Sequence, residues 1–93
     1  MEQETAVRVK ITGRVQGVCF RAFTRDTAAG LRLSGYVRNC TDGTVECLFQ
    51  GPKEEVAAMI QRCWEGPPLS QVDQVAQSHI PLDSYLQGFQ IRY

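Results

Sequence analysis

The chain has 93 residues, of which 43% are hydrophobic and 22% are charged, a composition typical of a small globular domain and unlike that of disordered or collagen-like chains. Ten Lys and Arg residues balance ten Asp and Glu residues, and this neutral total argues against a protein that follows nucleic-acid phosphates, which needs an excess of cations. The apolar runs are too short to span a membrane, and residues 1–4 lack the basic and apolar parts of a signal peptide. We therefore expect one cytoplasmic domain over residues 1–93, monomeric by default, with neither a membrane nor a nucleic acid as partner.

The first part of the chain changes from the period of a strand to that of a helix. Apolar and polar residues alternate over 5–12, which predicts a half-buried strand. A loop with glycines near both ends follows over 13–19. From Phe20 the apolar residues recur at helical spacing, and we expect Gly30 to fray or end this helix.

In the rest of the chain we predict two strands, over 36–40 and 44–50, followed by a helix that opens at Gly51-Pro52 and stops at Gly66-Pro67-Pro68. A strand over 71–80 and a terminal strand over 86–93 complete the chain. Asp42-Gly43 supplies the positive φ that a hairpin turn requires between the first two strands. The second helix has the clearest amphipathic stripe, which begins at Val56.

This order is β-α-β-β-α-β with a further strand at the end. Two crossovers joined by a hairpin predict an α+β, ferredoxin-like two-layer sandwich, in which an antiparallel sheet carries both helices on one face. Many unrelated activities share this fold, so the function has to be argued from a site.

The thiols and the single imidazole do not form a recognisable metal motif. The chain has no Cys-x-x-Cys pair, and His79 stands alone near a strand end, where we expect a surface histidine. We expect free thiols rather than a disulfide framework, although a pairing of two cysteines stays open. The four cysteines are Cys19, Cys40, Cys47 and Cys63.

The neutral total conceals an uneven distribution of charge. Residues 1–38 carry seven cations against three acids, and residues 39–93 carry three cations against seven acids. The surplus of cations in the first half suggests an anion site there. Its best candidate is the junction at 13–21, because a glycine loop that leads into a helix gathers free main-chain N–H groups and Arg21 can offer two parallel N–H groups to a phosphate. From the spacing alone, an ordinary connection with a surface arginine is an equal alternative.

A second reading of this junction is a cysteine-dependent phosphatase. Cys19 and Arg25 have the Cys-x5-Arg spacing of that class. Its phosphate loop is normally built from glycine and small residues, whereas Phe20 and Phe23 lie between this pair and begin a helical pattern. We therefore disfavour Cys19 as a nucleophile.

Two long motifs decide between these readings. Residues 13–21 are G-R-V-Q-G-V-C-F-R, and residues 35–46 are G-Y-V-R-N-C-T-D-G-T-V-E. They resemble the signatures G-x-V-Q-G-V-x-F-R and G-[WY]-V-x-N-x-x-D-G-[ST]-V of the acylphosphatase family. The helix opening at Gly51-Pro52 and the ending F-Q-I-R-Y are also similar, so the resemblance runs over nearly the whole chain in register with the predicted elements.

The resemblance implies hydrolysis of the carboxyl–phosphate bond of small-molecule acyl phosphates, without a metal or cofactor. It implies that Arg21 is catalytic and binds the phosphoryl oxygens, and that Asn39, otherwise a common turn former, positions the attacking water. Inorganic phosphate or sulfate is expected to compete. The main-chain N–H groups implied in the phosphate cradle belong to Val15, Gln16, Gly17, Val18, Cys19 and Phe20.

Two smaller expectations concern the surroundings of Arg21. Arg14 lies in the loop, where we expect a solvated side chain that could add attraction for anions. We also hypothesise that the carboxylate of Tyr93 reaches back to hold Arg21.

Three binding modules remain as alternatives on the same fold. An RNA-recognition domain would need a K/R-G-[FY] pattern on the third strand, which is T-V-E-C-L-F-Q here. A metal chaperone would need Cys-x-x-Cys after the first strand. A regulatory anion-binding module without catalysis is the strongest alternative, and the presence of both Arg21 and Asn39 speaks against it.

Overall fold

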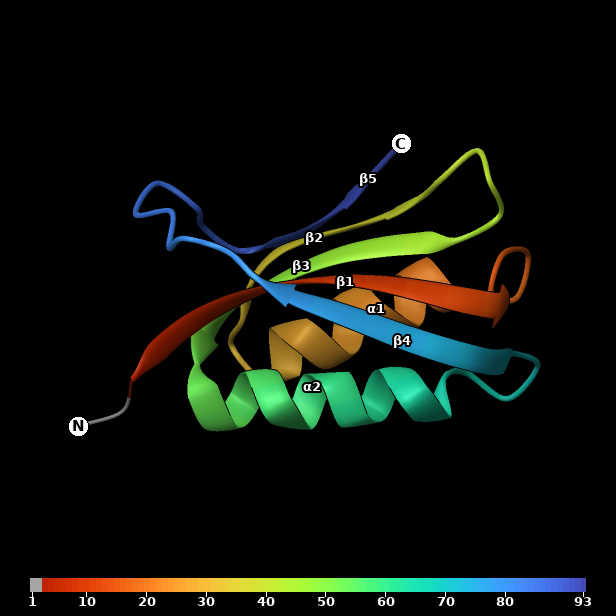
Figure 1. Ribbon diagram of the computed structural model, residues 1–93, viewed down its shortest axis with the longest axis horizontal. Helices are drawn as coiled ribbons and strands as arrows, with labels where there is room; N and C mark the ends of the chain where they lie inside the picture. The colour runs from red at the N-terminus through yellow and green to blue at the C-terminus, as the bar shows by residue number, and fades with distance from the viewer. Residues whose placement is uncertain (1–2) are drawn as a thin grey trace.

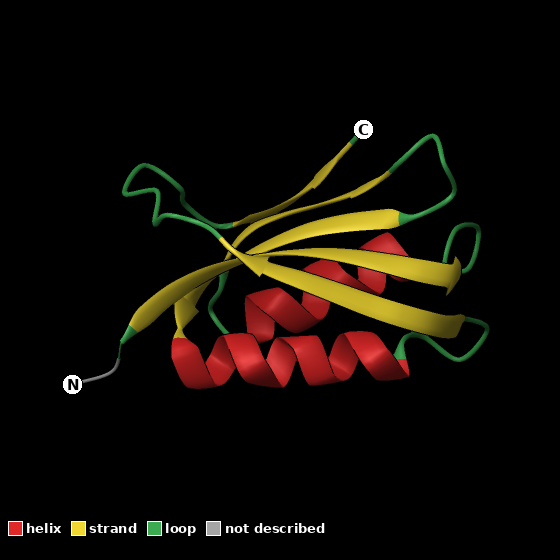
Figure 2. Cartoon of the chain, in the orientation of Figure 1, coloured by secondary structure: helices red, strands yellow, loops and turns green. Residues whose placement is uncertain are grey.

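The computed structural model describes residues 3–93 and confirms the predicted order of elements (Figure 1). The elements are β1 (Glu4–Arg14), α1 (Phe20–Gly30), β2 (Ser34–Asn39), β3 (Val45–Pro52), α2 (Lys53–Glu65), β4 (Gln71–His79) and β5 (Phe89–Arg92). The strands form one five-stranded sheet in the order β4-β1-β3-β2-β5, and both helices cover the same face of it (Figure 2). The expected ferredoxin-like α+β sandwich is therefore confirmed.

The sheet is mixed, which corrects the expectation of a wholly antiparallel one. Three pairings, β1 with β3, β1 with β4 and β2 with β3, are antiparallel, but β5 runs parallel to β2 with Val37 opposite Ile91. The reason lies in the order of the strands. Because β4 occupies the edge beside β1 and runs opposite to β2, the loop over 80–88 both crosses to the β2 edge and reverses the chain, so β5 arrives in the direction of β2.

The core lies between the sheet and the helical layer. The alternating residues of β1 that were predicted to face inward are buried, with Val9 and Ile11 completely shielded from solvent. From the other layer, Met59 of α2 packs into the same cluster. The amphipathic patterns of β1 and α2 therefore face each other, which is the layer packing that the sequence predicts.

The four cysteines are free thiols, as expected. Cys47 and Cys63 are buried in the core, and burial raises the pKa of both thiols, that of Cys63 to about 12. Cys47 lies opposite Val37 rather than opposite Cys40 in the β2–β3 hairpin. These two buried thiols are structural hydrophobic groups rather than nucleophiles. Neither helix of the described residues combines the length and apolar character that a membrane span requires.

Candidate active site

The loop between β1 and α1 is fixed by its own apolar side chains. Val15, Val18 and Phe20 are buried in the core, and this anchors the main chain on one side. Gly17 and Cys19 are exposed, and their main chain adopts the left-handed conformation, with φ of 74° and 65°. Left-handed residues at such turns direct successive N–H groups into one concavity, a geometry that binds anions. Glycine adopts this conformation freely, whereas Cys19 does so at a cost of about 1–2 kcal/mol.

The N–H groups of this loop are free to bind a ligand. Within the part of the chain that the structure describes, no main-chain N–H of residues 15–19 donates to a main-chain carbonyl. The carbonyl of Cys19 accepts the first helical bond, from the N–H of Phe23 at 3.1 Å, so the loop leads directly into the positive end of α1. Orphan donors and the helix dipole therefore coincide, and the loop is a cradle for an oxyanion.

A cleft of about 510 Å³ opens in front of the cradle. It is lined by Val15, Gly17, Cys19, Phe20, Arg21, Ala22, Arg25, Asn39, Ile91 and Tyr93. The β1–α1 loop and the β2–β3 turn lie at the same end of the sheet (Figure 1), which explains how residues from distant parts of the sequence meet there. The structure thus brings Arg21 and Asn39, the two side chains that the resemblance identifies, into one cleft with the cradle. Of the other predicted cradle residues, Gln16 and Val18 do not line the cleft.

Asn39 is the last residue of β2, and its amide oxygen has unmet hydrogen-bonding capacity. The Oδ1 atom is buried and has no hydrogen-bond partner among the described residues. A buried acceptor without a partner is costly, at about 1–3 kcal/mol, unless a water or ligand satisfies it. Asn39 therefore lines the cleft with an amide whose oxygen is a buried acceptor without a partner among the described residues.

Arg21 lies in the first turn of α1 and stacks on an aromatic ring. Its guanidinium carbon is 4.8 Å from the centre of the Tyr93 ring, a cation–π contact that leaves the N–H groups in the plane free to donate. No ion pair between described residues includes Arg21. The hypothesis that the Tyr93 carboxylate holds Arg21 is therefore replaced by a contact with the Tyr93 ring.

The side chain of Gln16 has a role that sequence reasoning missed. Its Nε2 donates to the main-chain carbonyl of Cys40 at 2.8 Å and to that of Thr44 at 2.9 Å. The cradle is thereby tied to the turn that follows Asn39. Gln16 sets the position of the cradle relative to Asn39, although its side chain does not line the cleft.

Replacing Gln16 with leucine is expected to lower the free energy of unfolding by about 1–3 kcal/mol, because two partly buried hydrogen bonds are lost. Urea denaturation measures the change. Gln50→Leu is the matched control, since Gln50 also makes two side-chain hydrogen bonds, to Asp83, but at an exposed position. An equal loss of stability in both variants would contradict a special role for the Gln16 bridge.

The turn beside Asn39 is held by a carboxylate. Asp42 Oδ1 accepts from the Thr44 hydroxyl at 2.6 Å and from the Thr44 N–H at 3.1 Å, and its Oδ2 lies 3.0 Å from Lys10 Nζ. The hydrogen bonds from Thr44, and then the ammonium group of Lys10, hold the pKa of Asp42 well below its ordinary value. The ionised carboxylate thus joins the turn to β1.

This pKa shift predicts a pH dependence of stability. A carboxyl group whose pKa is lower in the folded state stabilises the fold above its unfolded pKa of about 3.9, and the contribution is lost as the pH falls toward the folded value. We therefore expect wild type to be more stable than Asp42→Asn near neutral pH, and the difference to shrink as the pH falls below about 4. Urea denaturation over a series of pH values measures it. A difference that does not change with pH would contradict the role of the ionised carboxylate.

Two other candidate residues, Arg14 and His79, lie outside the cleft. Arg14 ends β1 with an exposed side chain, as expected of a solvated arginine, and does not line the cleft. His79 is exposed at the end of β4, as predicted for a surface histidine. Cys19 lines the cleft. Within residues 3–93, no three His, Cys, Asp or Glu side chains come together as a metal site.

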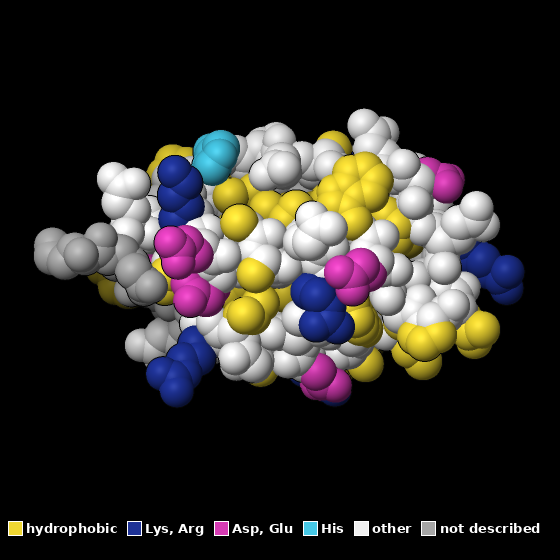
Figure 3. Space-filling model, turned by 90° about the horizontal axis from the view of Figure 1, so that it is seen from below, with side chains coloured by type: hydrophobic (Ala, Val, Ile, Leu, Met, Phe, Trp, Pro, Cys, Tyr) yellow, Lys and Arg dark blue, Asp and Glu magenta, His cyan; other side chains and the backbone are white. Residues whose placement is uncertain are grey.

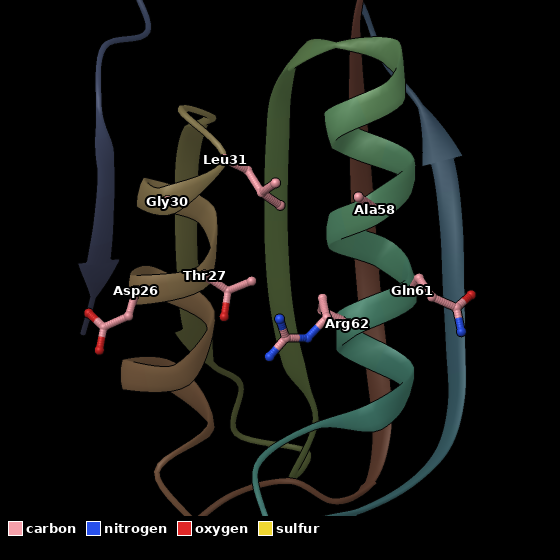
Figure 4. Close-up of a pocket in the computed structure, with 7 residues that line it drawn as sticks. All are labelled: Asp26, Thr27, Gly30, Leu31, Ala58, Gln61 and Arg62. Atoms are coloured by element: carbon pink, nitrogen blue, oxygen red, sulfur yellow. The ribbon is translucent and has the colours of Figure 1, made fainter.

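A larger groove of about 630 Å³ lies between the two helices, and Figure 4 shows Thr27 and Leu31 from one side of it and Arg62 from the other. The Arg62 guanidinium lies 5.5 Å from the Phe23 ring centre, and its Nε pairs with Glu65 at 3.4 Å. Seen from below in Figure 3, this side of the molecule mixes charged and hydrophobic side chains instead of gathering one kind. The groove lacks the converging free donors that the cradle has.

Known proteins resemble this chain over almost its full length. The profile of the family described as Acylphosphatase matches residues 7–91. An acylphosphatase of Pelotomaculum thermopropionicum is 42% identical over 85 residues, which cover 91% of this chain and 92% of that protein. An acylphosphatase of Rhizobium meliloti is 46% identical over 86 residues, which cover 92% of this chain and 90% of that protein.

Solved structures agree with the sequences. An acylphosphatase from Coxiella burnetii superimposes with a TM-score of 0.91 at 36% identity, over 96% of this chain and 93% of that one. The crystal structure of acylphosphatase from Bacillus subtilis gives a TM-score of 0.92 at 32% identity, over 98% of this chain and 100% of that one. The family resemblance carried by the two motifs is thus confirmed by profile, relatives and fold, and the chain belongs to the acylphosphatase family of hydrolases.

Proposed function

We propose that the protein hydrolyses the carboxyl–phosphate bond of acyl phosphates, and that Arg21, Asn39 and the cradle carry out the reaction. The observation that supports this most directly is that free N–H donors, the Arg21 guanidinium and Asn39, whose amide oxygen has no partner among the described residues, meet at one cleft. The products are a carboxylate and inorganic phosphate. Because inorganic phosphate and sulfate present the same oxygens, both compete with the substrate.

Binding of the phosphoryl group is divided between main chain and side chain. The N–H groups of residues 15–20 meet its oxygens at the positive end of α1, where the helix dipole favours an anion. Arg21 adds two parallel N–H groups, and its guanidinium lies over the Tyr93 ring. These donors are already oriented before the substrate arrives, so they stabilise the charge that develops on the phosphoryl oxygens without reorganisation.

Asn39 orients the water that attacks phosphorus. Its Oδ1 accepts a hydrogen from that water and thereby directs a lone pair at the phosphorus, opposite the leaving carboxylate. As the new P–O bond forms, the bond to the carboxyl oxygen breaks, and its electron pair leaves on the carboxylate. The proton of the water passes to a phosphoryl oxygen. A carboxylate is a good leaving group, so positioning and charge stabilisation suffice and the reaction as proposed requires no metal, cofactor or covalent nucleophile.

We further propose that residues 1–93 act as one domain and that the protein works as a cytoplasmic monomer. One chain supplies every group that the proposed reaction uses. The free thiols of the described chain are typical of a reducing compartment.

Hydrolysis of benzoyl phosphate by the wild-type protein, with and without a chelator, tests the proposed function. We expect activity that resists the chelator and that is kept in Cys19→Ser, because the thiol takes no part in the proposed reaction. Loss of activity in Cys19→Ser with full activity in Asn39→Ala would favour the cysteine-dependent phosphatase instead. A wild-type protein that binds phosphate but releases none from benzoyl phosphate would favour a regulatory anion-binding module.

A further inference from the structure

We propose that Arg25 forms a second anion site in the cleft and selects acyl phosphates whose acyl group carries a further negative charge. The inference rests on the proposed function, because it concerns the acyl side of the same substrate. Arg25 lines the cleft together with Arg21. The two residues are four apart on α1, so they lie on the same face of the helix, one turn from each other.

The guanidinium of Arg25 is available to a ligand. Its Nε donates to Asp26 Oδ1 at 3.1 Å, but the two side chains are 46% and 72% exposed, and such an exposed pair contributes little. Neither Nη group of Arg25 has a hydrogen-bond partner among the described residues. A guanidinium has five N–H donors, so a second carboxylate can be bound while the contact with Asp26 persists.

The cleft is lined by more positive charge than binding of the phosphoryl group requires in the proposed reaction. The lining residues include two arginines and, within the described chain, no Asp or Glu side chain. In the proposed reaction the cradle and Arg21 already meet the phosphoryl oxygens. The positive charge of Arg25 is therefore left for another part of the substrate.

The spacing of the two arginines limits the size of the acyl group. Four residues of helix rise by about 6 Å, which separates Arg25 from Arg21 along α1. Ala22 lines the cleft on the same helix with a small side chain, and Ile91 and the Tyr93 ring form apolar parts of the wall. An acyl chain with about two methylene groups between its carbonyl and a terminal carboxylate spans this distance. Succinyl phosphate is the simplest acyl phosphate with that geometry.

The preference for succinyl phosphate over butyryl phosphate, measured as the ratio of their kcat/KM values, tests the inference. The two substrates differ in a terminal carboxylate against a methyl group. We expect wild type to prefer succinyl phosphate and Arg25→Gln to lower the preference about five-fold, the value of one exposed charged contact. Arg14→Gln is the matched control, because it removes the same charge near the same loop but outside the cleft. We expect it to keep the wild-type preference, and added salt to reduce the preference in wild type.

Binding of non-hydrolysable isosteres separates this inference from the proposed reaction. The probes are 4-oxo-5-phosphonopentanoate and 2-oxopentylphosphonate, in which a methylene group replaces the bridging oxygen of each substrate. Tighter binding of the first probe that depends on Arg25 supports the inference, even if neither acyl phosphate is hydrolysed and the proposed reaction fails. A preference that Arg25→Gln leaves unchanged, or that Arg14→Gln lowers equally, overturns it, even if both substrates are hydrolysed.

Discussion

Arg21→Ala is expected to lower kcat/KM for benzoyl phosphate by about 10³-fold and to weaken inhibition by inorganic phosphate. In the proposed reaction the guanidinium is a preorganised donor at a position where charge develops, and among the described residues no other cleft-lining side chain of the first turn of α1 carries a charge. Both binding and turnover are expected to suffer, because in the proposed reaction Arg21 contacts the phosphoryl oxygens in the ground state as well as in the transition state. Steady-state kinetics with phosphate as a competitive inhibitor measure both effects.

Two further variants test whether the effect of Arg21→Ala is specific to the guanidinium and to its position. Arg21→Lys keeps the charge but loses the two parallel N–H groups and the stacking on Tyr93, so it is expected to recover only a small part of the activity. Arg14→Ala removes a cation outside the cleft and is expected to stay close to wild type. If Arg14→Ala and Arg21→Ala were impaired equally, the effect of Arg21 would be general attraction of anions rather than binding at the cradle.

Most of the fold could be predicted from the sequence, because its elements have clear local patterns. The alternation around Val9 and Ile11, the stripe that begins at Val56 and the stop at Gly66 each specify an element without reference to the rest of the chain. The direction of β5 has no such local pattern. It depends on which sheet edge is free after β4 has paired with β1, a property of the assembled sheet. That strand is nevertheless important for the site, since it brings Ile91 and Tyr93 to the cleft.

The site was predictable to the extent that its groups are close in sequence or belong to a motif. Gly17 and Arg21 lie in one segment, and Asn39 lies in the second motif. The bridge from Gln16 had no sequence signal, because its partners are main-chain carbonyls more than twenty residues away and any residue type provides a carbonyl. The position of Arg25 did have a signal, since a spacing of four from Arg21 places both on one face of a helix.

The backbone conformation of the cradle was likewise predictable only in part. Gly17 suits a left-handed turn, but nothing in the residue type of Cys19 indicates a φ of 65°. The conformation is imposed from both sides, by the buried neighbours Val18 and Phe20 and by the start of α1. The geometry of the cleft is thus stabilised by the packing of adjacent residues into the core, a combination that composition and spacing do not reveal.

Asn39→Ala is expected to lower kcat for benzoyl phosphate by about 10²–10³-fold while leaving inhibition by inorganic phosphate close to wild type. The amide in the proposed reaction orients the water and does not bind the phosphoryl oxygens, so its loss affects turnover rather than phosphate binding. This separation of kcat from phosphate affinity distinguishes Asn39 from Arg21. Asn39→Asp is the second variant, and its negative charge is expected to weaken phosphate binding by repulsion in addition to lowering kcat.

The stability of Asn39→Ala provides an independent check. Because Oδ1 is buried without a partner among the described residues, its removal is expected to leave the free energy of unfolding unchanged or to raise it by about 1 kcal/mol. Catalytic residues are often retained although they lower stability, and we expect Asn39 to show this combination. If Asn39→Ala instead unfolded more easily and kept its activity, Asn39 would be a residue of the β2–β3 turn, and the orientation of the attacking water would have to come from the cradle alone.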